Sequence, residues 1–168
     1  MNREHSLKSE SASDAVLIEL RRIIQSIDLH SRALVKKFGL TGPQLTVLKT
    51  LDGEGEVSVG ELSKIVSLRQ ATVTGILERL EKRSLVSRRR SDKDRRRVLV
   101  LTTEKADRLL KKAPSLLQDS FVEQFNNLED WEQSMIKSAL QRIVTMMDAK
   151  KIHAEPILTT GPIDEQEK

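Results

Sequence analysis

The chain has 168 residues, of which 38% are hydrophobic, 32% are charged and only 2% are aromatic. This length suits one domain, or one domain with an extension, whose core is built from Leu, Ile and Val. The chain has no cysteine, which excludes disulfides, thiolate metal sites and thiol-based switches. The net charge of +4 identifies no partner, so the distribution of charge carries more information than its sum.

We expect a cytoplasmic protein with no membrane partner. The first residues, MNREHSLKSESASD, contain no apolar run of the kind found in signal peptides. Nowhere do about 18 apolar residues follow one another, which is the length that a spanning helix needs.

The first part of the chain predicts two helices after a polar arm. Residues 1–12 are rich in Ser, Lys and Glu and are expected to be a flexible arm. An apolar stripe then predicts a helix over 14–37 that ends at Gly39. Thr41 and Gln44 form a capping box that starts a second helix, and 52–56 (DGEGE) has the composition of a turn.

The middle of the chain predicts a helix-turn-helix followed by a hairpin. Val57 is expected to make a short strand contact, and a capping box over 58–61 starts a short helix that ends near Val66. After a tight turn over 67–69, helical spacing resumes and predicts a longer helix over 70–83. The hydrophobic period then changes to two, which predicts a β-hairpin over 86–101 with a charged loop.

The last part of the chain predicts two more helices and a tail. Thr102 or Thr103 caps a helix whose apolar pattern runs on to Phe125, with a bend at Pro114. We expect Asn127 to cap the final helix, and 151–168 to be irregular. The fold class is therefore mainly α, a winged helix-turn-helix over 40–102 with long terminal helices.

Positive charge is concentrated on the hairpin. Between Arg79 and Arg97 there are ten basic and three acidic residues, a net charge of +7, so the rest of the chain sums to −3. Basic runs are usually solvated surfaces. This one follows a helix-turn-helix pattern, which favours contact with the phosphates of double-stranded DNA. The expected wing contacts are Arg88, Arg89, Arg90, Lys93, Arg95, Arg96 and Arg97.

The start of the 70–83 helix has a different character. It offers small or hydrogen-bonding side chains without negative charge, and such residues can address base edges in the major groove. They could equally be ordinary surface residues. The expected recognition-helix contacts are Arg69, Gln70, Ala71, Thr72, Thr74, Gly75 and Arg79.

These stretches resemble the MarR family of winged-helix regulators over about residues 14–148. The matching segments are 40–48 (LTGPQLTVL), 61–66 (ELSKIV), 71–83 (ATVTGILERLEKR) and 94–102 (DRRRVLVLT). The resemblance implies a homodimer on near-palindromic DNA, in many cases a repressor that releases DNA when it binds a small ligand. It also implies that an Arg of the wing tip, Arg96, enters the minor groove and that Asp94 braces it.

The resemblance further implies that the terminal helices, within 13–38 and 103–150, form the dimer interface. Its expected residues are Val16, Leu17, Leu20, Ile23, Ile24, Phe121, Phe125, Trp131, Leu140, Ile143 and Met147. A lone His in a long helix is usually a packing residue, but His30 falls where this family has an effector pocket. The segment 147–162 is similar to the tail of regulators of compatible-solute (ectoine) genes, which suggests an osmotic signal.

Three residues depart from the family pattern. Gly75 stands where relatives often have a long polar side chain, Ser84 where Gly is common after Lys-Arg, and Ala106 where many relatives have Gly.

No catalytic, cofactor or metal pattern is present in the sequence, so we expect neither an enzyme nor a metal site. Two alternatives to a sequence-specific regulator stay open. One is a nonspecific architectural DNA-binding protein, and the other is a helical adaptor whose wing only aids solubility.

Overall fold

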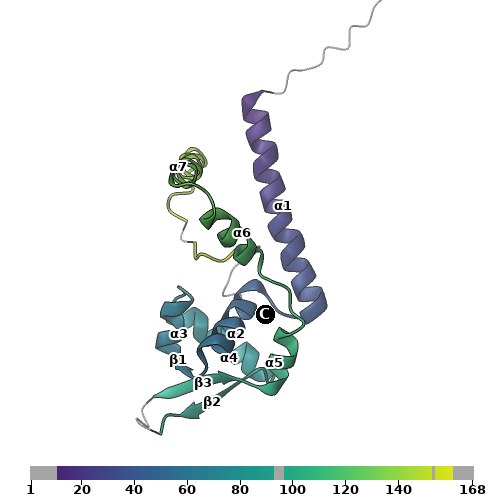
Figure 1. Cartoon of the computed structure of the whole chain (residues 1–168), viewed down its shortest axis with the longest axis vertical. Helices are drawn as coiled ribbons and strands as arrows, with labels where there is room; N and C mark the ends of the chain where they lie inside the picture. The colour runs from purple at the N-terminus through teal and green to yellow at the C-terminus, as the bar shows by residue number, and fades with distance from the viewer. Residues whose placement is uncertain (1–10, 93–96, 153, 161–168) are drawn as a thin grey trace, which may run out of the picture.

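The computed structural model describes residues 11–92, 97–152 and 154–160. Its first element, α1 (Ala12–Phe38), is a long helix that rises from one side of the molecule (Figure 1). Ser11 and Asp14 form a capping box at its start, and Gly39 ends it in the left-handed region at φ 63°. The predicted helix is therefore confirmed, and it begins two residues earlier than expected.

A compact lobe follows at the foot of α1. Thr41 and Gln44 cap its first helix as predicted, although that helix runs on through three of the residues predicted to be a turn. The elements are α2 (Gly42–Glu54), β1 (Val57–Ser58), α3 (Val59–Ile65), α4 (Gln70–Lys82), β2 (Val86–Arg90) and β3 (Val98–Thr102).

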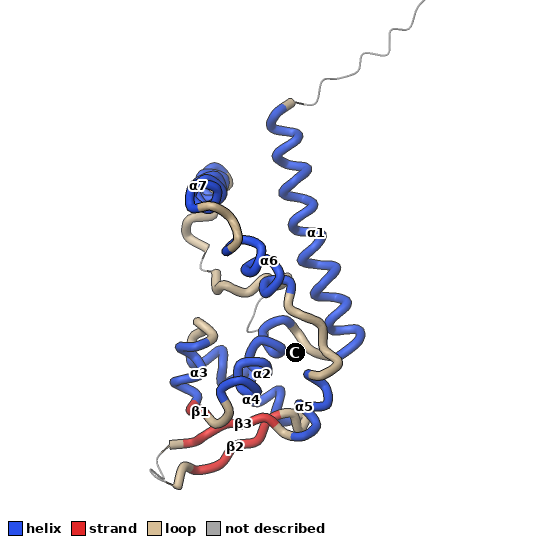
Figure 2. Tube along the Cα trace, in the orientation of Figure 1, coloured by secondary structure: helices blue, strands red, loops and turns tan. Residues whose placement is uncertain are grey.

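The three strands form one small antiparallel sheet at the edge of the lobe (Figure 2). Their order is β1-β3-β2, and Val100 of β3 pairs with Val57 on one side and with Arg88 on the other. The hairpin therefore extends from the lobe but is joined to the start of α3 through β1. This is a winged helix-turn-helix.

The core of the lobe is aliphatic, as the composition predicted. Its fully buried side chains come from α2, α3 and α4, from the turn before α2 and from the residues beside the sheet. They exclude water from the space between the three helices. The largest are Leu40, Leu45, Leu48, Leu51, Leu62, Ile76, Leu77, Leu80 and Leu85.

The helix predicted to bend at Pro114 is two separate helices. These are α5 (Glu104–Leu110) and α6 (Leu117–Asn126), and residues 111–116 between them are not helical. Pro114 has no N–H to continue the helix, and it disfavours helical geometry in the residue before it. The prediction of one bent helix was wrong because a buried residue, Leu116, and a new capping carboxylate, Asp119, start a second helix instead.

The last helix, α7 (Asp130–Met146), also begins differently from the prediction. Its N-cap is Glu129, which forms a capping box with Glu132. Asn127 is instead the C-cap of α6, so the prediction that it caps the last helix was wrong.

The helices divide into two groups by burial. Ala106 of α5 is buried in the core of the lobe, so α5 packs with the lobe. The dimerisation region expected over 103–150 stays a prediction. No residue of α6 or α7 is buried, and Leu34 is the one buried residue of α1. These three helices stand away from the lobe (Figure 1). Long apolar side chains on all three are exposed.

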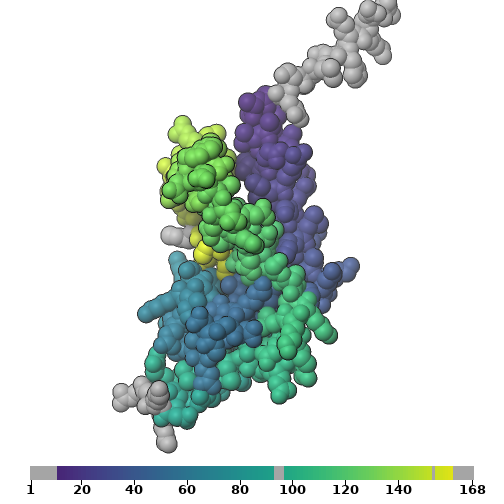
Figure 3. All heavy atoms as spheres, viewed as in Figure 1, coloured from purple at the N-terminus to yellow at the C-terminus, as the bar shows by residue number. Residues whose placement is uncertain are grey.

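Residues 154–160 have no regular secondary structure, but they pack against the lobe and α6. Ile157 is 8% exposed and is part of the core cluster. The N–H of Leu158 donates to the side-chain oxygen of Gln118 at 3.2 Å, and Thr159 approaches Gly42 at the start of α2. The segment runs from α7 back across the lobe, between α6 and the helix-turn-helix (Figure 3).

Within the part of the chain that the structure describes, no helix is both long enough and apolar enough to cross a membrane.

Candidate nucleic-acid interface

The turn before α4 sets the direction of that helix. Ser67 takes a left-handed conformation at φ 55°, and the N–H of Leu68 donates to the carbonyl of Ser63 at 3.0 Å, which closes the end of α3. Leu68 is buried beneath the turn. Arg69 then takes the extended conformation of an N-cap residue, and α4 begins at Gln70.

The predicted base-reading residues lie together on the first two turns of α4. Gln70 and Ala71 are exposed, and Thr72, Thr74 and Gly75 are partly exposed. The hydroxyl of Thr74 donates to the carbonyl of Gln70 at 2.9 Å. Its oxygen can still accept a hydrogen bond, and its methyl group can contact an apolar base edge.

Gly75 and Arg79 form one local arrangement on this face. The Nε of Arg79 donates to the carbonyl of Gly75 at 3.2 Å, and a Cβ built on Gly75 would lie 4.0 Å from a terminal nitrogen of Arg79. The guanidinium of Arg79 thus lies back along the helix beside Gly75, where an added Cβ would make only an ordinary contact with it.

Three of the predicted wing cations are bound to carboxylates from other elements. Arg88 lies 3.1 Å from Glu81 of α4. Arg89 donates to Glu56 through two nitrogens, from Nε at 2.7 Å, and also lies 3.0 Å from Asp92. These contacts hold the pKa of Glu56 below its ordinary value, chiefly through the hydrogen bond from Arg89.

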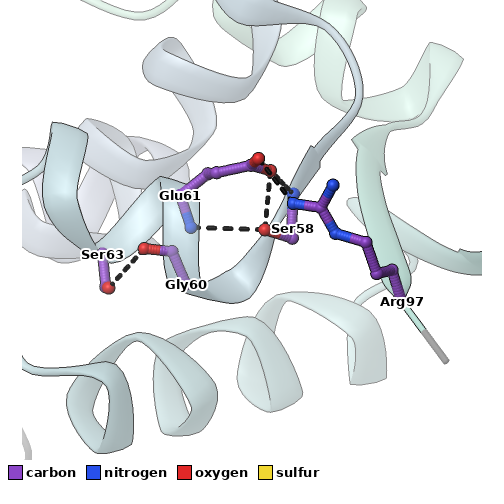
Figure 4. Close-up of polar contacts among 5 residues, drawn as sticks. All are labelled: Ser58, Gly60, Glu61, Ser63 and Arg97. Atoms are coloured by element: carbon purple, nitrogen blue, oxygen red, sulfur yellow. Dashed lines mark hydrogen bonds and ion pairs between the residues drawn. The ribbon is translucent and has the colours of Figure 1, made fainter.

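Arg97 makes the third contact, with the start of α3 (Figure 4). Its Nη2 lies 2.6 Å from Oε1 of Glu61. The other carboxylate oxygen of Glu61 accepts hydrogen bonds from Ser58, from the N–H at 2.9 Å and from the hydroxyl at 2.6 Å. The hydrogen bonds from Ser58, aided by Arg97, lower the pKa of Glu61 to about 2.

The remaining basic residues of the segment differ in role. Arg90 is exposed at the end of β2. Arg83 points toward the C-terminus of α1, where it donates to the carbonyl of Phe38 at 3.0 Å and to that of Gly39. A cation at a helix C-terminus is attracted to the negative end of the helix dipole, so Arg83 stabilises the junction between α1 and the lobe. Lys93, Asp94, Arg95 and Arg96 lie outside the described residues.

The predicted dimer residues gather on α1, α6 and α7. Of these, Ile24 is 61% exposed and Trp131 is 65% exposed. Phe121 and Phe125 stack on one another with ring centroids 5.6 Å apart. Leu20, Phe125 and Ile143 are partly exposed, and the other eight are exposed.

His30 lines a pocket of about 290 Å³ between α1 and the segment that joins α5 to α6. Its Nε2 is buried and has no hydrogen-bond partner among the described residues. Two lysines also line the pocket, Lys37 from α1 and Lys112 from the connection after α5, and the rest of the lining is apolar: Ala33, Leu34, Phe38 and Pro114.

The sequence did not predict that Glu56 and Glu61 form ion pairs with arginines of the wing. The signal for Glu61 was present, because its capping box was recognised. Its contact with Arg97 depends on the pairing of β1 with β3, which sequence spacing alone does not give.

The helix-turn-helix is formed by α3 and α4, and the hairpin of β2 and β3 is joined to it by ion pairs and carries most of the basic residues. These features define a winged helix-turn-helix protein. The family model described as the MarR family matches residues 40–98. The chain is 32% identical to the HTH-type transcriptional regulator MgrA of Staphylococcus aureus over 107 residues, which are 64% of this chain and 70% of MgrA. It is 27% identical to the HTH-type regulator YsmB of Bacillus subtilis over 131 residues, 78% of this chain and 90% of YsmB.

Solved structures of MarR-family proteins have the same fold as this chain. BpsR of Bordetella bronchiseptica, whose DNA binding is regulated by 6-hydroxynicotinic acid, is 30% identical, with a TM-score of 0.52 over 79% of this chain and 95% of BpsR. A mutant of MarR from E. coli in complex with operator DNA shares the fold at 22% identity, with a TM-score of 0.53 over 77% of this chain and 94% of that one. The chain belongs to the MarR family and is a transcriptional regulator, not an enzyme.

Proposed function

We propose that this regulator is a homodimeric repressor that binds near-palindromic double-stranded DNA. The observation that carries the proposal is the placement of a small, polar, uncharged helix face beside a cationic wing. Residues 70–75 supply hydrogen-bonding groups suited to base edges, and the wing supplies cations suited to phosphates. The operator-bound MarR of E. coli, which shares the fold, supports the same use of this surface.

The test is binding of the purified protein to the DNA upstream of its own gene and to a scrambled duplex, across a salt series. Selective binding with a steep salt dependence supports a sequence-specific regulator. Equal binding to both duplexes would favour an architectural protein, and no binding to either would favour an adaptor. Repression is tested separately, by placing the bound DNA before a reporter gene and comparing expression with and without the regulator.

Base reading by α4 has its own test. Gln70→Ala and Thr72→Ala should each cost about 1–3 kcal/mol on the preferred DNA and little on a random duplex. Equal losses on both duplexes would show that these residues only support the fold or the phosphate contacts.

Homodimerisation is supported by the exposed apolar face of α1, α6 and α7. Apolar side chains at this density are seldom left in water, and a second copy would bury them.

Ile24→Glu should yield monomers with weak DNA affinity, because it places a charge in the interface. Gln25→Glu adds the same charge about 100° further round α1, off the apolar stripe, and should leave the dimer intact. Sedimentation velocity distinguishes them, and an intact dimer in Ile24→Glu would overturn this interface.

A small ligand is expected in the pocket beside His30. Its two lysines, and an imidazole nitrogen that no described residue pairs with, fit a small anion with an apolar body, such as an aromatic carboxylate. Regulation of BpsR by 6-hydroxynicotinic acid supports this class of ligand. Release of DNA on addition of 6-hydroxynicotinate should be lost in Lys112→Gln and kept in Lys111→Gln, whose side chain does not line the pocket.

Response to an osmotic signal stays a prediction, which the salt series also tests.

A further inference from the structure

Two carboxylates hold the wing from one side. Glu56 and Glu61 flank the short strand β1, which pairs with β3. Glu56 receives Arg89 of β2, and Glu61 receives Arg97, the residue directly before β3. The pair with Glu61 joins the hairpin to the first helix of the helix-turn-helix, and the pair with Glu56 joins it to the residue directly before β1.

The contacts are made where the hairpin begins to turn. The N–H of Ser91 donates to the carbonyl of Arg97 at 2.9 Å, which closes the hairpin beyond β2 and β3. Arg89 lies two residues before Ser91, so both arginines are anchored next to the turn. A wing anchored at this point is fixed relative to α3, and through α3 relative to α4.

The carboxylate of Glu61 is itself held from a second direction. Ser58 donates to it from the backbone and from its hydroxyl, so the carboxylate cannot follow Arg97 if that arginine moves toward another anion. Arg89 is similarly engaged by Glu56 and Asp92 together. A phosphate that attracts either arginine must therefore compete with a preformed partner.

This competition affects random and preferred DNA differently. Binding to random DNA depends almost entirely on net positive charge, and an arginine paired with a carboxylate contributes little net charge. Binding to a preferred sequence depends also on geometry, and the paired arginines keep their position and their unused N–H donors. The pairs should thus reduce random binding more than selective binding.

Building on the DNA-binding function proposed above, we propose that Glu56 and Glu61 are specificity-determining residues, which suppress binding to random DNA and position the wing. The variants that test this are Glu56→Gln, Glu61→Gln and the double variant. Gln still accepts the hydrogen bond of a capping box, so the start of α3 is preserved in Glu61→Gln. The matched control is Glu54→Gln, which removes a nearby exposed carboxylate that has no ion-pair partner among the described residues.

The measurement is affinity for the preferred duplex and for a random duplex across a salt series. Each variant should bind random DNA about two- to fivefold more tightly, the range expected for an exposed ion pair. The double variant should steepen the salt dependence, by about 0.9 in the log–log slope for each arginine that gains a phosphate. Its affinity for the preferred duplex should rise less, so that the ratio of the two affinities falls.

Three results would overturn the inference. An equal gain in Glu54→Gln would show an effect of net charge alone. Unchanged random binding in the double variant would show that the pairs do not compete with phosphate. Equal gains on both duplexes would show no role in selectivity. Failure of the wild-type protein to bind either duplex is a separate outcome, because it overturns the proposed function before any variant is compared.

Discussion

Substitution of Ile157 tests whether the segment 154–160 is part of the folded body. Its side chain is 8% exposed and lies in the core cluster, although it follows the last helix. Ile157→Ala removes three carbon groups at about 0.8 kcal/mol each, and so about 2.4 kcal/mol of burial. The loss cannot exceed the free energy with which the segment docks, because a weakened segment can detach while the lobe stays folded. We therefore expect a loss of about 2 kcal/mol, equivalent to about 4–8 °C in Tm for a chain of this size.

The matched control is Ile152→Ala, the same substitution at a residue that is 71% exposed. It should change the free energy of unfolding by less than about 0.5 kcal/mol. Thermal unfolding at one fixed protein concentration compares the two, since the Tm of a dimer depends on concentration. Trypsin, which cleaves after Lys150 and Lys151, should cut Ile157→Ala faster than the wild type. Equal shifts in both variants, or no shift in Ile157→Ala, would refute docking of this segment in solution.

Three further predictions concern the lobe. Ser84→Gly should stabilise the protein by about 0.5–1 kcal/mol in urea denaturation, because Ser84 is held at φ 58°, where a Cβ is unfavourable. Thr103→Ala should cost about 1 kcal/mol, since Thr103 caps α5 and its hydroxyl donates to the carbonyl of Ser84 at 2.8 Å. The pKa of Glu61 is lowered from 4.5 to about 2, so its stabilising contribution is complete above 4.5 and is lost as the pH falls toward 2. The difference in unfolding free energy between wild type and Glu61→Gln should be constant from about pH 7 to 5 and should shrink below pH 4.5; a difference that changes above pH 5 would contradict this.

Local chemistry made most element boundaries predictable. Thr41 with Gln44, and Ser58 with Glu61, are capping boxes whose residues lie three apart, so a single turn of chain contains the whole signal. The change of period from helix to strand after Leu85 similarly needs only neighbouring residues. The order of the helices and the hairpin therefore followed from short-range information.

The errors came where tertiary packing decides between local alternatives. A proline within an apolar helical pattern can bend a helix or end it, and here burial of Leu116 favours two helices over one. Ile157 lies in a stretch that contains Pro and Gly, and this composition predicts an irregular tail. Its burial depends on packing against core residues far away in sequence, and no local pattern predicts that.

The sequence predicted where the basic residues are, but not which of them are already paired with groups of the protein. That depends on which segments the fold brings together. The segment 79–97 carries a net charge of +7, but a net count treats every cation as available. Arg83 instead faces the carbonyls that end α1, and Arg97 faces a carboxylate 36 residues away in sequence. Each of these cations contributes first to holding the lobe together. The field that reaches a phosphate is therefore set by which carboxylates the fold brings to the wing. On the role proposed for Glu56 and Glu61, substitutions at these two positions tune selectivity without changing the wing itself.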